Sequence, residues 1–300
     1  MKDLSPLHRF LSLSQYVKMF TINIKGKIIH FDRPAVMGIL NITPDSFYSQ
    51  SRCWNQDSLS DTAERLVNEG ADIIDIGGYS SRPGAEDVTP EEEIRRLSIG
   101  ISAIRKIAPA IPISVDTFRA DVAKAAILDL GADIINDISA GDLDRNMFDT
   151  VSELNVPYIA MHMRGTASDM QSYTDYTAQG GVTNDIISKL AEKIDRLEQK
   201  GVSDIIVDPG FGFAKTTEQN FEVLHNLSII GSTLDRPVLV GVSRKSMIYK
   251  TLGITPGESL NGTTAINVMA LERGASILRV HDVTEARQAI GLWTKMKEIS

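Results

Sequence analysis

Acidic and amide side chains recur at one kind of position in this chain, at the end of a short apolar run. Asp116, Asn136 and Asp208 are the clearest cases, each following a stretch rich in Ile and Val. Two carboxylates and an amide placed together can orient a heterocycle that carries N–H groups, because fixed polar groups in a concave site set the direction of a ligand. These residues predict a pocket for such a heterocycle, provided that the fold brings them to one place.

A second set of side chains with similar placement is basic. Eight of them follow the apolar runs or lie close behind, at Arg52, Arg82, Arg164, Lys215, Arg244, Lys245, Arg279 and His281. Guanidinium and ammonium groups bind phosphate and carboxylate oxygens, so we expect this set to recognise an anionic part of a substrate. Ser246 opens a predicted helix, whose first N–H groups also favour an anion.

Each of these residues, taken singly, also has an ordinary structural interpretation. An Asp after a strand commonly caps a helix, Arg164 and Lys215 could be loop charges, and His162 could be a core histidine with satisfied nitrogens. The functional prediction therefore depends on their joint occurrence. The sequence contains no H-E-x-x-H, Walker A or G-x-S-x-G signature, which disfavours zinc hydrolases, P-loop proteins and serine hydrolases.

Side chains this far apart in the chain meet only in a regular fold, and the chain does repeat itself. Four segments share one layout, in which a helix-like stretch ends at a glycine and a short apolar run follows. The glycines are Gly70, Gly131, Gly201 and Gly274. Glycine takes the left-handed conformation that ends many helices, and a short run that is apolar throughout is typical of a parallel strand covered on both faces.

Eight strands are predicted from these repeats and the runs between them, near residues 35–40, 72–77, 112–115, 133–136, 156–161, 204–207, 237–242 and 276–280. Helical patterns fill the intervals. Residues 183–200 place apolar side chains on one face, and Thr89-Pro90 with Glu92 has the form of an N-cap, a first-turn proline and a capping box. Eight alternating units predict an α/β fold, a (β/α)8 TIM barrel. An open doubly wound sheet is the alternative, although no G-x-G-x-x-G follows the first strand.

The barrel prediction accounts for most of the chain. Residues 21–31 resemble a β-hairpin that turns at Lys25-Gly26, and we expect it to close the bottom of the barrel. Residues 1–19 form an N-terminal extension with no assignment. No linker rich in Pro, Gly or Ser interrupts residues 20–300, which we therefore interpret as a single domain.

Composition limits the partners that this chain can have. Its 31 basic and 39 acidic residues give a net charge of −8, which argues against binding to nucleic acid or to an anionic membrane. The single cysteine, Cys53, allows no internal disulfide and fits a reducing compartment. The first twenty residues have no continuous apolar stretch of the signal-peptide kind, and no run approaches the length of a membrane span. A cytoplasmic protein is expected.

Seven motifs at the predicted strand ends together resemble the dihydropteroate synthase family, the pterin-binding folate enzymes that sulfonamides inhibit. In chain order they are N-I-T-P-D-S-F from Asn41, S-S-R-P-G-A from Ser80, V-D-T, I-N-D-I, D-P-G-F-G-F, V-S-R-K-S and R-V-H, ending at His281. The resemblance extends from about Phe20 to the C-terminus. It implies that 6-hydroxymethyl-7,8-dihydropterin diphosphate condenses with 4-aminobenzoate, giving 7,8-dihydropteroate and pyrophosphate in folate biosynthesis.

The resemblance also implies a role for each matched residue. The pterin would be held by Asp116, Asn136, Met161, Asp208, Gly241 and Lys245. The diphosphate would lie against Asn41, Ser81, Arg279, Val280 and His281, with the cofactor Mg²⁺ bound by Asn41. The 4-aminobenzoate pocket would be framed by Arg82, Pro83, Phe213 and Ser246. The catalytic residues would be Asp116, Lys245 and Asp45.

The mechanism that the resemblance implies is SN1-like. The C–O bond to the diphosphate breaks first and leaves a pterin-stabilised cation, with Asp116 as the neighbouring carboxylate. Two positions depart from the family pattern: Ser49 replaces the second acidic residue of the first loop, and Tyr79 replaces a glutamate in the second. Any role of the first-loop carboxylate at position 49 is therefore not transferred, while Asp45 remains.

Two other functions stay open on the sequence alone. A pterin-dependent methyltransferase on the same barrel would share the Asp and Asn residues, but such proteins lack the paired T-P-D-S-F and S-R-P-G loops. A non-catalytic pterin-binding paralogue would be expected to lose the charged strand-end residues. The family is usually a homodimer packed through barrel helices, so the resemblance implies a homodimer here too.

Overall fold

Eight parallel strands form the centre of the molecule. The computed structural model describes residues 20–42, 56–79, 88–166 and 168–299. Within them the central strands are β3 (Ala35–Asn41), β4 (Ile73–Gly77), β5 (Ile113–Asp116), β6 (Ile134–Asp137), β7 (Tyr158–Met161), β8 (Ile205–Asp208), β9 (Leu239–Val240) and β10 (Ile277–Val280). Each is close to a strand predicted from the sequence.

The sheet closes on itself. Its order is β8-β7-β6-β5-β4-β3-β10-β9, and all neighbouring pairs are parallel. A parallel bridge between Val207 and Val238 joins the two end strands, and the Val207 N–H donates to the Pro237 carbonyl at 3.0 Å. The TIM barrel prediction is confirmed, and the alternative of an open doubly wound sheet is wrong.

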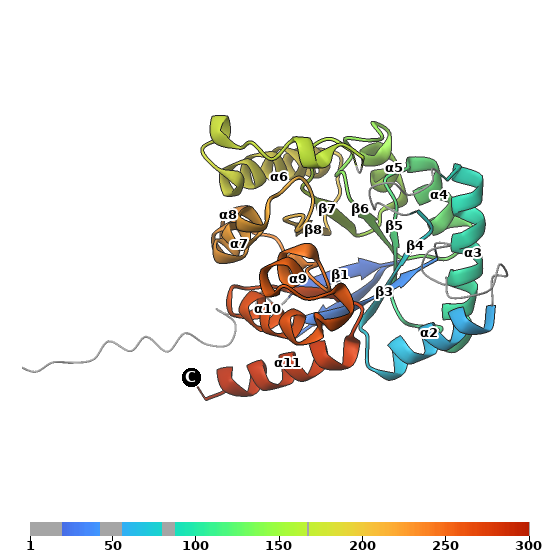
Figure 1. Ribbon diagram of the computed structural model, residues 1–300. Helices are drawn as coiled ribbons and strands as arrows, with labels where there is room; N and C mark the ends of the chain where they lie inside the picture. The colour runs from blue at the N-terminus through green and yellow to red at the C-terminus, as the bar shows by residue number, and fades with distance from the viewer. Residues whose placement is uncertain (1–19, 43–55, 80–87, 167, 300) are drawn as a thin grey trace, which may run out of the picture.

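Helices surround the strands on all sides (Figure 1). They are α2 (Gln56–Asn68), α3 (Pro90–Ile107), α4 (Ala120–Leu128), α5 (Met147–Leu154), α6 (Val182–Gln199), α7 (Thr217–His225), α8 (Leu227–Leu234), α9 (Ser246–Leu252), α10 (Leu260–Glu272) and α11 (Val283–Lys297). Short 3₁₀ turns lie at Met170–Ser172, Thr177–Gln179 and Pro256–Glu258. Across the described ranges, no helix combines the length and the hydropathy that crossing a bilayer would require.

Local signals in the sequence explain where several helices begin and end. The four glycines predicted to end helices all have positive φ, with values of 91°, 83°, 85° and 88° for Gly70, Gly131, Gly201 and Gly274. A residue with a Cβ would be strained in this conformation. The repeated pattern therefore marks the same structural event, the left-handed exit from a helix into the next barrel strand.

The start of α3 is confirmed in part. Thr89 is the N-cap, and its Oγ accepts a hydrogen bond from the Glu92 N–H at 3.3 Å. The predicted capping box is wrong, because the Glu92 carboxylate instead accepts hydrogen bonds from Arg95 and Arg96 on the next turn. Ionic partners three and four residues away compete successfully for the same carboxylate.

A hairpin closes the bottom of the barrel, as predicted. Strands β1 (Phe20–Ile24) and β2 (Lys27–Phe31) are antiparallel and turn at Lys25-Gly26, where both residues have positive φ. The rings of Phe20 and Phe31 stack with centroids 4.6 Å apart. Their apolar face packs on interior side chains from the first part of the strands, which we call the floor: Ala35, Met37, Ile73, Ile134, Ile159, Ile206, Leu239 and Ile277.

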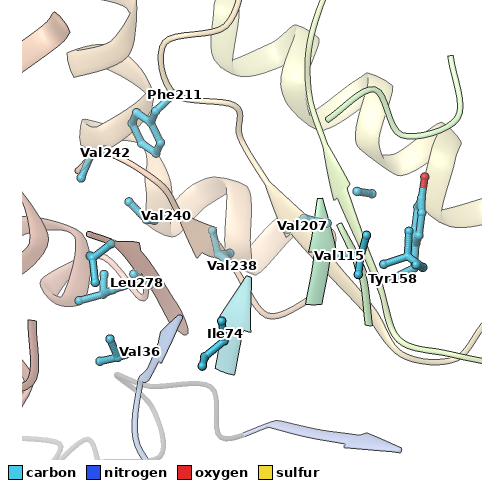
Figure 2. Close-up of a cluster of buried hydrophobic side chains, with 14 of the residues drawn as sticks. Val36, Ile74, Val115, Tyr158, Val207, Phe211, Val238, Val240, Val242 and Leu278 are labelled. Carbon is cyan, nitrogen blue, oxygen red and sulfur yellow. The ribbon is translucent and has the colours of Figure 1, made fainter. Parts of the chain in front are cut away.

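Alternation along the strands separates the floor from two other layers. Side chains that point outward, such as Val36, Ile74, Val115, Val207 and Leu278, join a larger hydrophobic cluster between the barrel and its helices (Figure 2). Residues two positions beyond the floor face inward again, because side chains in a strand alternate with a period of two. In β4, β6, β7, β8, β10 and the segment after β9 these are Asp75, Asn136, Met161, Asp208, Arg279 and Gly241. The interior therefore changes from apolar to polar toward the carboxyl ends.

Strand β9 is shorter than the predicted strand at 237–242. Pro237 has no N–H to donate to a ladder, and Gly241 already belongs to the turn that leads to α9. Only Leu239 and Val240 pair regularly, with Ile277 and Leu278 of β10.

Candidate functional site

An arginine between two carboxylates forms the centre of the polar interior. Arg279 Nε donates to Asp75 Oδ2 at 2.6 Å, and its Nη2 donates to Asp116 Oδ2 at 2.9 Å. Asn136 Nδ2 donates to the same Asp75 oxygen at 3.2 Å. Three residues predicted to bind substrate are thus linked: Asp75 joins Arg279 to Asn136, and Arg279 contacts Asp116.

Sequence reasoning missed Asp75. The predicted site residues all lie at or after strand ends, whereas Asp75 lies in the middle of the β4 run Ile73-Ile-Asp-Ile76. The available signal was a carboxylate flanked by Ile on both sides. In a barrel strand such a side chain points either into the barrel or toward the helices, and in both places it is removed from water and needs partners. Its side chain is fully buried in the structure.

The segment after β8 brings Asp208, Lys245 and Phe213 together. Asp208 Oδ1 accepts a hydrogen bond from the Gly210 N–H at 2.7 Å. Lys245 Nζ donates to the Phe211 carbonyl at 2.5 Å and lies 4.8 Å from the centre of the Phe213 ring. Lys245, predicted to bind the pterin, and Phe213, predicted to border the aminobenzoate, are therefore in contact.

Glycines create the space that these groups enclose. A Cβ added to Gly241 would lie 3.9 Å from Arg279 Cβ and 4.0 Å from Asp208 Oδ2, so this glycine keeps the gap between the two side chains open. Met161, buried on the neighbouring strand β7, pairs in register with Asp208. The two predicted lining residues thus border the same part of the interior.

Burial moves the pKa values of ionisable side chains in this interior toward neutral pH, because it disfavours their charged forms. It raises the pKa of Asp116 to about 7, with Arg279 acting in the opposite direction, and it raises the pKa of Asp208 against the opposing effect of Lys245. It lowers the pKa of Lys245 to about 8, although the Asp208 charge opposes that change. Groups with perturbed pKa values gathered in one concave place are typical of a functional site.

Asn41, the predicted metal ligand, lies beside Asp116. A Cβ added to Gly77 would be 3.6 Å from Asn41 Oδ1 and 3.5 Å from Asp116 Cβ, so both side chains border the same glycine. His281 Nδ1 is 3.0 Å from Ser243 Oγ. The Val280 side chain belongs to the outer hydrophobic cluster, so only its backbone can face a ligand in the barrel.

Three members of the predicted anion-binding set have partners within the protein. Arg164 pairs with Asp185 at 2.7 Å and Arg244 pairs with Asp282 at 2.6 Å, so protein carboxylates already neutralise both guanidinium groups. Lys215 is buried away from solvent. The two arginines thus resemble Arg279, which also pairs with carboxylates. Binding of a substrate anion by Arg164, Arg244 and Lys215 stays a prediction.

Lys215 and His162 are satisfied inside the protein. Lys215 Nζ makes hydrogen bonds to the carbonyls of Gly210 at 2.9 Å and Phe213 at 3.1 Å, and to His162 Nδ1 at 3.1 Å. His162 Nε2 is 2.9 Å from Asp185 Oδ2. Burial, followed by the nearby Lys215 charge, lowers the pKa of His162 to about 4. The core-histidine interpretation of His162 is thus the one that the structure supports.

Tyr79, one of the two departures from the family pattern, has a defined environment. Its ring meets the ring of Phe118 edge to face at 5.2 Å, and the Arg119 guanidinium lies 5.2 Å from its centre. Arg119 also pairs with the buried Glu93 at 2.5 Å. The tyrosine thus belongs to an aromatic and cationic cluster that follows β4 and β5.

Several predicted residues lie outside the described ranges, namely Asp45, Ser49, Arg52, Ser81, Arg82 and Pro83. Of the predicted aminobenzoate pocket, the structure describes Phe213 and Ser246. Ser246 is the first residue of α9, directly after Lys245, which is the N-cap of that helix.

Comparison with known proteins identifies the family of this chain. The family model described as pterin binding enzyme matches residues 37–281. The dihydropteroate synthase of Clostridium beijerinckii is 41% identical over 261 residues, which cover 86% of this chain and 92% of that protein. The structure of the Xanthomonas albilineans dihydropteroate synthase with 4-aminobenzoic acid has a TM-score of 0.85 at 37% identity, covering 93% of this chain and 99% of that one.

Longer relatives contain the same region as one part. The folic acid synthesis protein fol1 of Schizosaccharomyces pombe is 38% identical over 93% of this chain, but the chain spans only 38% of the length of that protein. The chain belongs to the pterin binding enzyme family and, within it, to the dihydropteroate synthases.

Proposed function

We propose that this chain joins 6-hydroxymethyl-7,8-dihydropterin diphosphate to 4-aminobenzoate, forming 7,8-dihydropteroate and pyrophosphate. The observation that carries the proposal is the meeting of Asp116, Asn136, Asp208 and Lys245 around Arg279 at the carboxyl ends of the strands. Active sites of TIM barrels lie at this face, and these groups provide both acceptors for a pterin and cations for a diphosphate.

The pterin ring fits the acidic and amide groups. Asn136 and Asp208 would accept its N–H groups, Lys245 would donate to a ring acceptor, and Met161 and Gly241 would line the slot. Asp116 would lie next to the carbon that loses the diphosphate. Its carboxylate stabilises the positive charge that develops there, and a charge in a water-poor site acts more strongly than in bulk solvent.

The diphosphate fits the other side of the site, at Arg279, His281, the backbone of Val280 and, from the sequence, Ser81. Mg²⁺ fits Asn41, because an amide oxygen is a hard ligand and this ion commonly takes one or two protein ligands together with substrate phosphates. Bound there, it would neutralise charge on the leaving group. Among the described residues, no cluster of three or more His, Cys, Asp or Glu side chains provides an alternative metal site.

The 4-aminobenzoate would lie against Phe213 and Ser246, with Arg82 and Pro83 completing its pocket and Asp45 acting from the first loop. The C–O bond to the diphosphate breaks with its electron pair on the departing oxygen. The amine nitrogen then bonds to the same carbon and releases a proton. No covalent bond to the enzyme is needed for this sequence of steps.

A direct assay separates the proposal from its alternatives. Purified protein with both substrates and Mg²⁺ is expected to release pyrophosphate and form dihydropteroate. Methyl transfer to cobalamin without pyrophosphate release would identify a methyltransferase instead. Absence of any diphosphate-dependent binding in calorimetry would identify a non-catalytic paralogue.

We further propose that residues 20–300 form one domain and that two copies associate through the face formed by α10 and α11. Leu292 and Met296 are 77% and 50% exposed, and both line an apolar cavity of about 700 Å³ together with Trp293. Apolar area of this kind is expected at an interface between subunits. Light scattering should give twice the chain mass, and Leu292→Glu should give the mass of one chain.

We keep the prediction of a cytoplasmic protein, which the single Cys53 supports.

A further inference from the structure

Asp75 lies one layer deeper than the strand-end residues and has no role in the proposed function so far. Its neighbour two residues earlier, Ile73, belongs to the floor, and Gly77, two residues later, borders Asp116 and Asn41. Because inward-facing residues of a strand recur every second position, Asp75 lies between the apolar floor and the substrate site. A carboxylate at such a depth is costly unless it has partners.

Its hydrogen bonds determine how two predicted ligands present themselves. Both Arg279 Nε and Asn136 Nδ2 donate to Asp75 Oδ2. A carboxylate only accepts hydrogen bonds, so the Asn136 amide must turn its NH₂ group toward Asp75. The Asn136 oxygen is therefore the atom left for a ligand, and that oxygen requires an N–H donor. The same contact holds one edge of the Arg279 guanidinium, while Asp116 holds another.

The second oxygen of Asp75 has no such partner. Asp75 Oδ1 is buried and makes no hydrogen bond within the part of the chain that the structure describes, and the same is true of Ser114 Oγ. Ser114 lies directly opposite Asp75 in the register of β4 and β5. All the anchoring thus passes through one oxygen, which an asparagine at position 75 could also supply, although without the negative charge.

We propose that Asp75 is a positioning residue, which fixes the Asn136 amide and the Arg279 guanidinium through a single buried oxygen so that the pterin and its diphosphate are recognised together. This inference rests on the proposed function. Its consequence is specific: loss of Asp75 affects the ring through Asn136 and the diphosphate through Arg279, whereas the aminobenzoate side at Phe213 and Ser246 is not involved.

The test compares Asp75→Ala, Asp75→Asn and the matched control Ser114→Ala. In Asp75→Ala the Asn136 amide is free to rotate and Arg279 retains one anchor. We expect kcat/KM for the pterin diphosphate to fall about 100-fold, while KM for 4-aminobenzoate changes less than about twofold. Asp75→Asn keeps the accepting oxygen and should recover at least about tenfold of that loss. Ser114→Ala, in the same layer, should stay within about twofold of the unchanged protein.

Binding provides a readout that is independent of turnover. By calorimetry, Asp75→Ala should weaken 6-hydroxymethylpterin, which lacks the diphosphate, about tenfold and should weaken the pterin diphosphate more strongly. Equal weakening of the two ligands would overturn the link to Arg279, and an unchanged affinity for both would overturn the inference entirely. If Asp75→Ala does not fold, failure of Asp75→Asn to exceed 1% of normal activity would contradict the single-oxygen role. Inactivity of the unchanged protein would instead contradict the proposed function.

Discussion

Two lysines lie at the segment that follows β8, the buried Lys215 and the half-buried Lys245, and the protein uses them in opposite ways. Lys215 directs its ammonium group at three acceptors, the carbonyls of Gly210 and Phe213 and the His162 ring. Among the described residues, Lys245 makes one hydrogen bond, to the Phe211 carbonyl, and its ammonium group also lies near the Phe213 ring. An ammonium group has three donors, so the first lysine is fully used by the fold and the second keeps donors for a ligand.

The comparison teaches that a buried charge is not by itself a sign of function. Burial lowers the pKa of both side chains, that of Lys215 to about 7 and that of Lys245 to about 8. By this measure Lys215 is the more perturbed group, although its donors are all matched by protein acceptors. The number of donors without a protein acceptor, rather than the size of the pKa shift, distinguishes the lysine that we propose to bind substrate from the structural one.

The largest expected effect is on catalysis, at Lys245. Lys245→Met removes the donor proposed for the pterin but keeps the length and the apolar stem of the side chain. We expect kcat/KM for the pterin diphosphate to fall by about 10³, or about 4 kcal/mol of transition-state stabilisation, with little change in thermal midpoint. Steady-state kinetics and a melting curve check both parts. A variant that retained a tenth of normal activity would remove the basis for treating the two lysines as different.

The next effect should be on stability, at Lys215. Lys215→Met leaves the His162 nitrogen and two carbonyl oxygens without their shared donor, so we expect the free energy of unfolding to fall by about 3 kcal/mol. Denaturant titration measures this change. Activity per folded molecule should fall far less than in Lys245→Met, and a loss as large as in that variant would show that Lys215 also acts on the substrate.

Two glycines in the same segment, Gly210 and Gly212, test the same difference between a structural position and one beside the proposed binding residue, with smaller expected effects. A Cβ at Gly210 would lie 1.9 Å from the His162 carbonyl oxygen, a backbone atom that cannot move aside. A Cβ at Gly212 would lie 3.2 Å from Lys245 Cδ, part of a flexible side chain. Both glycines have positive φ. We expect Gly210→Ala to cost about 3 kcal/mol or more of stability, and Gly212→Ala about 1 kcal/mol, with a raised KM for the pterin substrate.

The smallest expected effect is the pH dependence of turnover. Asp116 must be ionised to stabilise the cation and Lys245 must be protonated to donate. Activity should therefore rise as the pH passes the raised pKa of Asp116, about 7, and fall as it passes the lowered pKa of Lys245, about 8. Lys245→Arg should move the alkaline limb upward because a guanidinium keeps its proton. If Lys215→Arg moved that limb equally, the limb would belong to the other lysine.

Much of the fold could be predicted because the same local features recur in successive units of the barrel. A left-handed glycine, a strand apolar on both faces and a polar residue at its end recur along the chain, and all three depend on short-range chemistry. The hairpin was predictable for the same reason, from Lys25-Gly26 between two alternating runs. The pairing of Thr89 with a capping-box glutamate was not, because the outcome depended on Arg95 and Arg96 competing for Glu92.

The site could be predicted where a residue's position at a strand end is sufficient to place it. This holds for Asp116, Asn136 and Asp208, because the carboxyl ends of the strands meet at one face of a closed barrel. It was not predictable where pairing decides. The sequence did not reveal that Arg164 and Arg244 pair with Asp185 and Asp282. Asp75 could not be singled out either, because its two partners lie 61 and 204 positions away in the chain.

The join between β8 and β9 has a consequence for the dynamics of the barrel. Where β3 and β4 pair through five residues, the closure rests on one bridge between Val207 and Val238. Amide protons along this seam should exchange with solvent faster than those of the fully paired strands, since local opening requires few bonds to break. Asp208 and Gly241 lie on opposite sides of the seam. If a pterin binds between them as proposed, it would join the two strands, and its binding should slow that exchange.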